Sequence, residues 1–360
     1  MLKKTTILIA PLDWGLGHAT RCIPIIKTLQ ELGCTIIIAS EGPTQQILSQ
    51  AFPSITCVPL QGYHIHYSRK KSRFAFKIFT QIPKIIGVIY KEHRWLKKVV
   101  KNYAVDAIIS DNRFGCYHHS VPCVYITHQL GIQTGNSKVD KLAQIIHLHF
   151  IKKYTQCWVP DFEGKENIAG ILSHPKVVPA NATYIGCLSR FQSIPSVKKM
   201  YDVVIVISGP EPQRTIFENL FLNQLHDFTG KVLMVRGLPG SKVDMPSVNI
   251  KNLEVHTHLS SQELNRVIQQ AQMIICRSGY TTIMDLIKLQ QKAIMVPTPG
   301  QVEQEYLANY LFEKGMYYSV PQHKFVLQKA LNDAASFPYH FPLFNMEQYK
   351  KKIAQFVSKI

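Results

Sequence analysis

Short apolar runs alternate with amphipathic stretches along most of the chain. The runs have the length of β-strands and are almost unbroken, which is typical of parallel strands that helices cover on both faces. In the first half, this pattern predicts strands at residues 5–12, 34–40, 105–111, 121–127 and 156–160. Helices are expected at 19–33 and 44–52.

The same alternation begins again after residue 200. Strands are expected at 201–209, 230–237, 253–259, 272–279 and 292–298, with helices at 213–225, 260–271 and from 281 onward. The pattern therefore predicts an α/β protein of two Rossmann-like, doubly wound parallel-sheet domains that face a cleft. Their expected bounds are 1–185 and 201–335, with a linker at 186–200 and a C-terminal helical segment, 336–360, that packs back toward the first domain.

The composition is that of a globular protein of the cell interior. The 360 residues suffice for two ordinary domains, and 46% of them are hydrophobic. The eight cysteines are scattered without metal-ligand spacing, so reduced thiols that pack as small apolar groups are expected. The first apolar run is too short for a signal sequence, and no segment approaches the ~20 apolar residues that span a bilayer. We therefore expect a cytoplasmic protein.

The net charge of +18 is unusually high and unevenly distributed. Residues 69–101 carry eleven Lys or Arg and one acid, a net +10, interleaved with aromatic and aliphatic residues. This segment is interpreted either as a solvated helix with a core-facing apolar stripe or as a peripheral contact with the anionic inner leaflet of a membrane. A nucleic-acid patch is a third interpretation, but no nucleic-acid motif accompanies the charge, so nucleic acid is not an expected partner.

Candidate chemistry lies in the loops that follow the predicted strands, because ligands of open parallel sheets bind beyond the carboxyl ends of the strands. After the first strand, Gly15 and Gly17 permit a tight turn into a helix whose free N–H groups favour an anion. His18 follows as a candidate general base, or else as a histidine that only caps the helix. Thr20 stands where the Gly-rich fingerprint of dehydrogenases has its third small residue, and Glu41 follows the second strand, where a ribose-binding acid would lie. A nicotinamide-dependent enzyme is therefore an alternative.

The second half repeats this arrangement in three loops. Ordinary helix caps would also use such residues, but three polar loops at strand ends favour a bound nucleotide sugar. A carboxylate at Asp285, one turn inside a helix, suits the paired hydroxyls of a ribose, and Arg214 could reach a phosphate with both ends of its guanidinium. The candidate ligand-binding residues are Gly15, Gly17, Ser208, Gly209, Arg214, His258, Ser278, Gly279, Thr281, Asp285, Gln301 and Gln304.

Three stretches resemble motifs of a known enzyme family. "CRSGYTTIMDLI…KAIMVPTPGQVEQEYLANYL" is similar to the donor-binding signature of the GT-B glycosyltransferases that include the peptidoglycan lipid I N-acetylglucosaminyltransferase, and "GLGHATR" and "THQLG" resemble its N-terminal motifs. The resemblance implies an N-terminal acceptor domain and a C-terminal donor domain. It also implies that Ser278 and Gly279 face the diphosphate, that Asp285 holds the ribose, and that Gln304 holds the donor sugar.

Three departures from the family pattern leave the donor sugar and the acceptor open. Asp285 stands where the family usually has Glu, Glu305 replaces its second amide, and "SGPEPQR" replaces its Gly-Gly-Ser turn. The resemblance implies an inverting transfer from a nucleotide donor, expected to be UDP-linked, to a hydroxyl acceptor that is lipid-linked or an envelope glycan.

The implied reaction needs a base but no covalent nucleophile. His18 and Asp111 are the two candidate bases. His258 is expected beside the base of the nucleotide. No cofactor is expected, and no metal, because backbone dipoles and arginine can stabilise the leaving diphosphate. The paired histidines of the chain lack acidic or Cys partners at ligand spacing. A nucleotide-sugar epimerase of the same fold and a non-catalytic nucleotide-binding protein remain alternatives.

Overall fold

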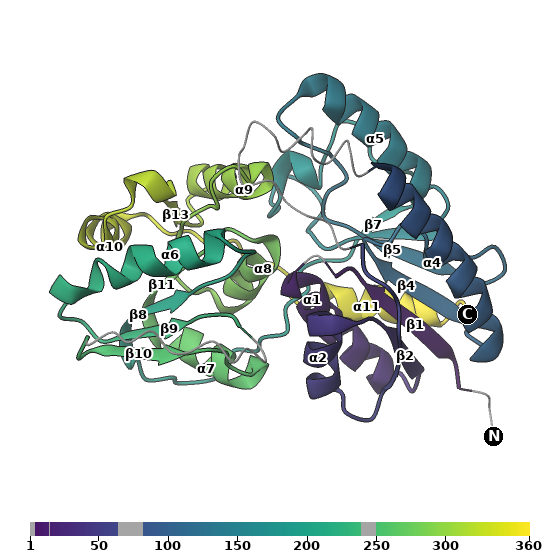
Figure 1. Ribbon diagram of the computed structural model, residues 1–360, viewed down its shortest axis with the longest axis horizontal. Helices are drawn as coiled ribbons and strands as arrows, with labels where there is room; N and C mark the ends of the chain where they lie inside the picture. Colours follow the sequence, from purple (N-terminus) through teal and green to yellow (C-terminus); the bar gives the residue numbers. More distant parts are fainter. Residues whose placement is uncertain (1–3, 14, 64–81, 239–249) are drawn as a thin grey trace. The chain divides into compact units, whose positions relative to one another are not determined.

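The computed structural model describes residues 4–13, 15–63, 82–238 and 250–360, and the chain divides into two compact units (Figure 1). The first unit contains Met1–Leu188 together with Phe344–Ile360, and the second contains Ser189–Leu343. The chain thus first passes from one unit to the other between residues 188 and 189, inside the segment 186–200 that the sequence predicts to be a linker. The chain rejoins the first unit at residue 344, eight residues after the bound that the pattern predicts.

The first unit is built on a parallel sheet with the strand order β3-β2-β1-β4-β5-β6-β7. The sheet order reverses between β1 and β4, which is the point where doubly wound sheets bind ligands. The pairing of β1 with β4 places Pro11 opposite Asp111 at the carboxyl ends of both strands. The strands are β1 Thr6–Pro11, β2 Thr35–Ala39, β3 Thr56–Val58, β4 Ala107–Asp111, β5 Cys123–Ile126, β6 Gln156–Val159 and β7 Ala182–Tyr184.

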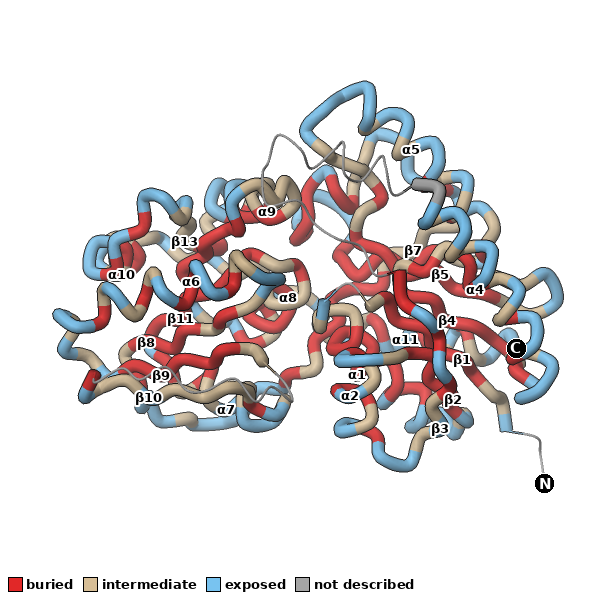
Figure 2. The backbone as a smooth tube through the Cα atoms, in the orientation of Figure 1, coloured by how far each residue is buried: buried red, intermediate tan, exposed pale blue. Residues whose placement is uncertain are grey.

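Helices cover this sheet and bury its apolar strands (Figure 2). Leu96 and Val99 of one helix and Ile151 of another join Leu8 and Ile108 of the sheet in a single core cluster. At the end of the chain, Phe356 meets Trp158 of β6 edge-on, with ring centroids 5.4 Å apart. The helices are α1 Leu16–Glu31, α2 Gly42–Ala51, α4 Ile82–Asn102, α5 Ser137–Ile151 and α11 Gln348–Val357.

The second unit repeats the arrangement with the strand order β10-β9-β8-β11-β12-β13, again all parallel. Its core joins Phe217 and Phe221 of α6 to Val203 and Ile205 of β8. The sheet order reverses between β8 and β11. The strands are β8 Tyr201–Val206, β9 Val232–Val235, β10 Leu253–His256, β11 Ala271–Cys276, β12 Ala293–Met295 and β13 Tyr318–Ser319. The helices are α6 Gln213–Leu222, α7 Ser261–Gln270, α8 Tyr280–Leu289, α9 Val302–Glu313 and α10 Leu327–Ser336.

The structure confirms the predicted fold class and the long elements. The pattern did not reveal the short edge strands β3, β7 and β13, since two or three residues are too few to show a period. Helix α5 was also missed, because several of its apolar residues point to solvent and blur the amphipathic pattern. All eight cysteines are free thiols and six of them are buried, as expected.

The basic segment is only partly described, since residues 69–81 lie outside the described ranges. From Ile82 it forms α4, whose six described Lys and Arg side chains are all exposed. Leu96 and Val99 of this helix pack into the core, whereas Ile86 and Tyr90 are 59% and 62% exposed. Within the described residues, no helix is both long enough and apolar enough to cross a membrane.

Candidate active site

The structure brings the two candidate bases of the first unit into contact. His18 lies in the first turn of α1, which Gly15 opens with a φ of 86° that favours glycine. Asp111 ends β4, and its Oδ1 atom lies 3.0 Å from Nδ1 of His18. With its proton on Nδ1, the ring donates to this carboxylate; Nη2 of Arg21 also lies 3.0 Å from Nδ1, and Nε2 makes no hydrogen bond among the described residues. The imidazole is thus oriented, with its second nitrogen available.

Arg21, one turn after His18, completes this group. Its Nε donates to Asp111 Oδ2 at 2.6 Å, and its Nη2 donates to Asp111 Oδ1 in a close ion pair. Its Nη1 lies 3.2 Å from Nδ1 of His128, which follows strand β5. Arg21, Asp111 and His128 are buried, whereas the side chain of His18 is 15% exposed.

The electrostatics separate the roles of the two candidate bases. Burial alone would raise the pKa of Asp111, but the guanidinium of Arg21 and the His18 ring hold that pKa well below its ordinary value. Burial lowers the pKa of His18 below its ordinary 6.5, and the charge of Arg21 adds to this, although Asp111 opposes it. Near neutral pH, this arrangement pairs a carboxylate that holds no proton with a neutral imidazole that can accept one.

Sequence reasoning did not assign roles to Arg21 and His128. A signal for Arg21 was present, because residues three apart on a helix share a face, and Arg21 follows His18 at that spacing. No local signal joins His128 to them, since more than one hundred residues separate it from Arg21. Only the order of the strands brings the two together.

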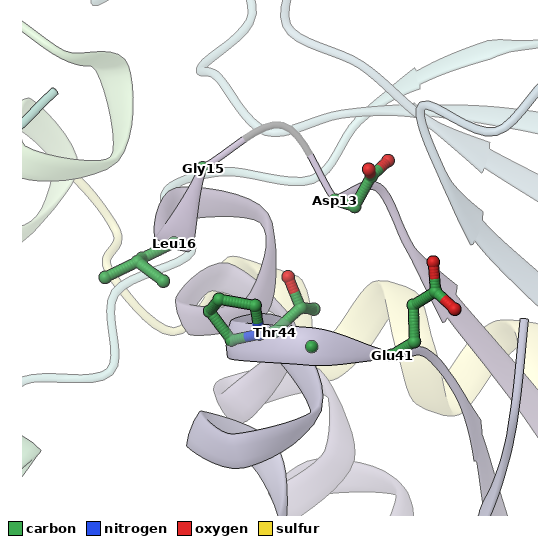
Figure 3. Close-up of a pocket in the computed structure, with 7 residues that line it drawn as sticks. Asp13, Gly15, Leu16, Glu41 and Thr44 are labelled. Carbon is green, nitrogen blue, oxygen red and sulfur yellow. The ribbon is translucent and has the colours of Figure 1, made fainter. Parts of the chain in front are cut away.

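A pocket lies at the starts of α1 and α2 (Figure 3). Asp13 and Glu41 line it, and their carboxylates also hold a neighbouring loop: Asp13 Oδ1 accepts from the N–H of Tyr63 at 3.1 Å, and Glu41 Oε1 from that of Gly62 at 2.6 Å. A Cβ at Gly62 would lie 2.1 Å from Asp13 Oδ2, so a larger residue there would displace the Asp13 side chain. Glu41 therefore fastens a loop, a role that its place after β2 did not predict.

In the second unit, the predicted loops meet at the carboxyl edge of the sheet. Ser278, after β11, is buried and donates its hydroxyl hydrogen bond to the carbonyl of Gln304 at 2.8 Å. The side-chain oxygen of Gln304 accepts from the N–H of Thr298 at 2.9 Å. Gly279 caps α8 and Gln301 caps α9, neither with a side-chain hydrogen bond, so the first N–H groups of both helices are not satisfied by a capping side chain. Thr281 is half-buried in the first turn of α8.

Asp285 is buried inside its own unit. Its Oδ1 accepts a 2.5 Å hydrogen bond from the hydroxyl of Ser189, and its Oδ2 lies 3.8 Å from Nε of Arg190. Burial raises the pKa of Asp285 to about 6, against the opposing charge of Arg190. His258 belongs to the same neighbourhood: burial lowers its pKa, and the charge of Arg190 lowers it further. Contact of Asp285 with a ribose and of His258 with a nucleobase stay predictions.

Arg214 is engaged within the unit as well. Its Nε, Nη1 and Nη2 donate to Glu211, Glu218 and Thr215 at 2.6, 2.8 and 3.0 Å. A phosphate would have to displace one of these partners, so the expected two-ended phosphate contact of Arg214 stays a prediction. Ser208 and Gly209 follow β8 in an open turn, where Gly209 has a φ of 105° and a Cβ would meet no atom within 4 Å.

The described residues contain no group of three or more His, Cys, Asp or Glu side chains that could hold a metal ion. Both units instead place polar side chains and helix N-termini where the sheet order reverses. This geometry suits the binding of a polar, anionic substrate together with the removal of a proton.

Comparisons with known proteins agree with this geometry. Residues 203–359 match the family model of the glycosyltransferase family 28 C-terminal domain. The UDP-N-acetylglucosamine–N-acetylmuramyl-(pentapeptide) pyrophosphoryl-undecaprenol N-acetylglucosamine transferase of Clostridium tetani is 20% identical over 364 residues, which cover 98% of this chain and 93% of that protein.

Solved structures show the same fold. The glycosyltransferase SnogD from Streptomyces nogalater aligns with a TM-score of 0.62 at 12% identity, over 99% of this chain and all of its own. MurG from Acinetobacter baumannii aligns with a TM-score of 0.56 at 14% identity, over the same shares. These structures show the GT-B fold, and together with the family 28 match and the relatives they identify the chain as a glycosyltransferase. Within that class it resembles the family of the peptidoglycan lipid I N-acetylglucosaminyltransferase, as its match to the family 28 C-terminal domain indicates.

Proposed function

We propose that the protein is an inverting glycosyltransferase that moves a sugar from a UDP-linked donor to the hydroxyl of an acceptor, with His18 as the general base. The observation that carries this proposal is the His18–Asp111 contact fixed by Arg21. Asp111 is a positioning residue: it keeps the proton of the imidazole on Nδ1, and Nε2 receives the proton of the attacking hydroxyl. The bond to the anomeric carbon forms as the bond to the diphosphate breaks.

The second unit supplies the donor side of this proposal. The starts of α8 and α9, reached through Gly279 and Gln301, offer backbone N–H groups to the diphosphate, and the helix dipoles favour its negative charge. Negative charge develops on the diphosphate as it leaves, and the backbone N–H groups and helix dipoles stabilise this charge. The reaction as proposed therefore requires neither a cofactor nor a metal.

The relatives support a lipid-linked acceptor. The Clostridium tetani protein is named for the transfer of N-acetylglucosamine to a pyrophosphoryl-undecaprenol substrate. We propose an acceptor of this class, met at the inner face of a membrane. The test is the incubation of the protein with UDP-N-acetylglucosamine, alone and with a lipid-diphosphate-linked sugar acceptor. Product that appears only with the acceptor supports transfer, whereas interconversion of the sugar without any acceptor would favour an epimerase.

The first prediction concerns the donor site. Asp285→Ala is expected to weaken UDP binding by roughly 1.5–3 kcal/mol, since it removes a charged hydrogen-bond partner of the ribose. Calorimetric titration of UDP measures the change. The matched control is Ser189→Ala, which removes the hydroxyl that Asp285 now accepts from and leaves the carboxylate in place. Wild-type affinity in the Asp285 variant would exclude this residue from ribose recognition.

The second prediction concerns the membrane. The described part of α4 exposes six basic side chains, and α5, which packs onto the same core cluster, exposes apolar ones, Ile145 at 66% and Leu142 at 54%. Basic residues near an anionic surface contribute ~1 kcal/mol each, and apolar side chains add burial in the interface. We expect co-sedimentation with phosphatidylglycerol vesicles that weakens as salt is added, because exposed charges are screened beyond about 10 Å at 0.1 M.

Charge reversal on α4 tests the assignment of this surface. Lys91→Glu combined with Lys98→Glu should reduce binding to the anionic vesicles, whereas Lys351→Glu, at an exposed position of α11, should not. Equal binding of the wild-type protein to phosphatidylcholine and phosphatidylglycerol vesicles would contradict the docking proposal and leave the segment as a solvated surface.

A further inference from the structure

Arg277 is a buried cation for which the described residues provide no carboxylate. It follows β11 and is 1% exposed. Its Nη1 donates to the carbonyls of Val296 and Pro297 at 3.0 and 3.2 Å, and its Nη2 donates to that of Gln213 at 3.2 Å. Its Nε makes no hydrogen bond, and its guanidinium carbon lies 3.7 Å from the ring centroid of Phe217.

The other buried arginines of this unit are paired with acids. Arg214 and Arg236 share the carboxylate of Glu218, at 2.8 and 2.7 Å. An unpaired buried charge costs several kcal/mol, and carbonyl groups and a ring offset only part of that. Burial lowers the pKa of Arg277 to about 9, so its guanidinium still carries a charge at neutral pH. Among the described residues of this unit, Arg277 is thus a buried positive charge without a counter-charge.

Two other buried polar atoms without partners come from the segments that Arg277 contacts. Gln213, whose carbonyl accepts from Arg277, begins α6, and its Oε1 is unpaired. Thr298 follows Pro297 beyond β12, and its Oγ1 is also unpaired. These residues follow β8, β11 and β12, which are adjacent in the sheet. The unpaired charge therefore lies at the carboxyl edge of the sheet, beside the starts of α6 and α8.

We infer that Arg277 is a positioning residue of the donor site, whose buried charge is matched by the diphosphate of the bound nucleotide. This inference rests on the proposed function, since it takes the ligand at this edge to be a nucleoside diphosphate. Arg277 does not touch the ligand, because its side chain is covered. It acts through its electric field, which reaches further in the low-dielectric interior than in water, and through the carbonyls just beyond β12 and at the start of α6 that it holds in place.

This role predicts a specific loss in affinity for the anion. In Arg277→Met, the affinity for UDP is expected to fall roughly tenfold more than that for uridine, because the two ligands differ only in the diphosphate and an interior charge several ångströms away contributes on this order. Titration of uridine, UMP and UDP measures the ratio of the two dissociation constants. That ratio is a property of the folded molecules, so partial unfolding of the variant does not distort it.

Two further variants separate charge from packing. Arg277→Lys keeps a cation but not the fork of donors, and it should retain more of the preference for UDP over uridine than Arg277→Met. Phe217→Leu removes the stacked ring but leaves the charge, and it should lower thermal stability while leaving the ratio at its wild-type value. A ratio that is unchanged in Arg277→Met, with a lowered melting temperature, would show that the residue is only structural and would overturn the inference.

The same titrations distinguish this inference from the proposed function. If the wild-type protein binds dTDP or GDP more tightly than UDP, the UDP assignment fails, and the comparison of Arg277→Met is made with the preferred diphosphate and its nucleoside. If the wild-type protein binds UDP no more tightly than uridine, the buried charge does not serve an anion and the inference about Arg277 is overturned.

Discussion

Replacing His18 by alanine is expected to reduce turnover by about 10² or more, the usual contribution of a general base. Folding and UDP binding should persist, because the hydrogen-bond contacts of the imidazole among the described residues are with Asp111 and Arg21, and His18 belongs to the first unit, whereas the proposed donor-binding loops belong to the second. Asp111→Asn should lose activity on a similar scale, since an amide no longer fixes the proton on Nδ1. Single-turnover rates at saturating donor measure both effects.

The pH profile checks which of the two residues is the base. His18 accepts a proton only when neutral, and burial together with Arg21 lowers its pKa below 6.5. The rate should therefore hold through neutral pH and fall as the pH drops through that lowered value. Asp111 would give a fall only at much lower pH, because its pKa lies well below its ordinary value. Near-normal rates in both variants would remove this pair from the mechanism.

The largest expected loss of stability follows from Glu92→Ala, at about 3–5 kcal/mol of unfolding free energy. Glu92 is the one acid of the basic segment 69–101, and α4 buries it to 2% exposure. Its Oε1 pairs with Nη1 of Arg113 at 2.7 Å, and its Oε2 accepts from the hydroxyl of Tyr63 at 2.7 Å and the N–H of Gly115 at 3.1 Å. Alanine would leave the guanidinium of Arg113 buried without its counter-charge.

Urea denaturation compares this variant with a surface pair. Glu347→Ala removes an acid that is 51% exposed and lies 2.9 Å from Lys350, so its cost should be at most about 1 kcal/mol. A similarly small cost in Glu92→Ala would show that Arg113 finds other partners, and that α4 is not fastened to the sheet through this carboxylate.

The candidate site was only partly accessible to sequence reasoning, for reasons that differ between the two units. His18 and Asp111 stand out because each follows an apolar strand, and the ends of parallel strands share one edge of the sheet. The pattern could not show that they form one unit, because their contact depends on β4 pairing with β1 across the intervening 95 residues. Arg21 reaches Asp111 through the same pairing of β1 with β4, and His128 is brought close by β5, the next strand in the sheet.

In the second unit, the sequence located the loops but not the partners of their side chains. The sequence predicts that Arg214 binds a phosphate, but in the structure its guanidinium pairs with Glu211 and Glu218, which lie about one helical turn before and after it. Asp285 looked like a ligand that faces the turn, yet it meets Ser189, 96 residues away. The motif "CRSG" gives no indication of a role for Arg277, because burial without a counter-charge depends on the tertiary structure and not on the neighbouring residues in the chain.

By itself, the sequence determined the α/β class, the two doubly wound sheets, the loops that carry the chemistry and the basic segment. These follow from local patterns, since apolar runs, glycines and polar residues at strand ends express backbone geometry and burial within a few positions. Only the tertiary structure decided which charges are paired and which are left alone: Asp111 with Arg21, Glu92 with Arg113, and Arg277 with no acid among the described residues. Pairing depends on distances between segments far apart in the chain, and those distances are set only when the strands take their order in the sheet.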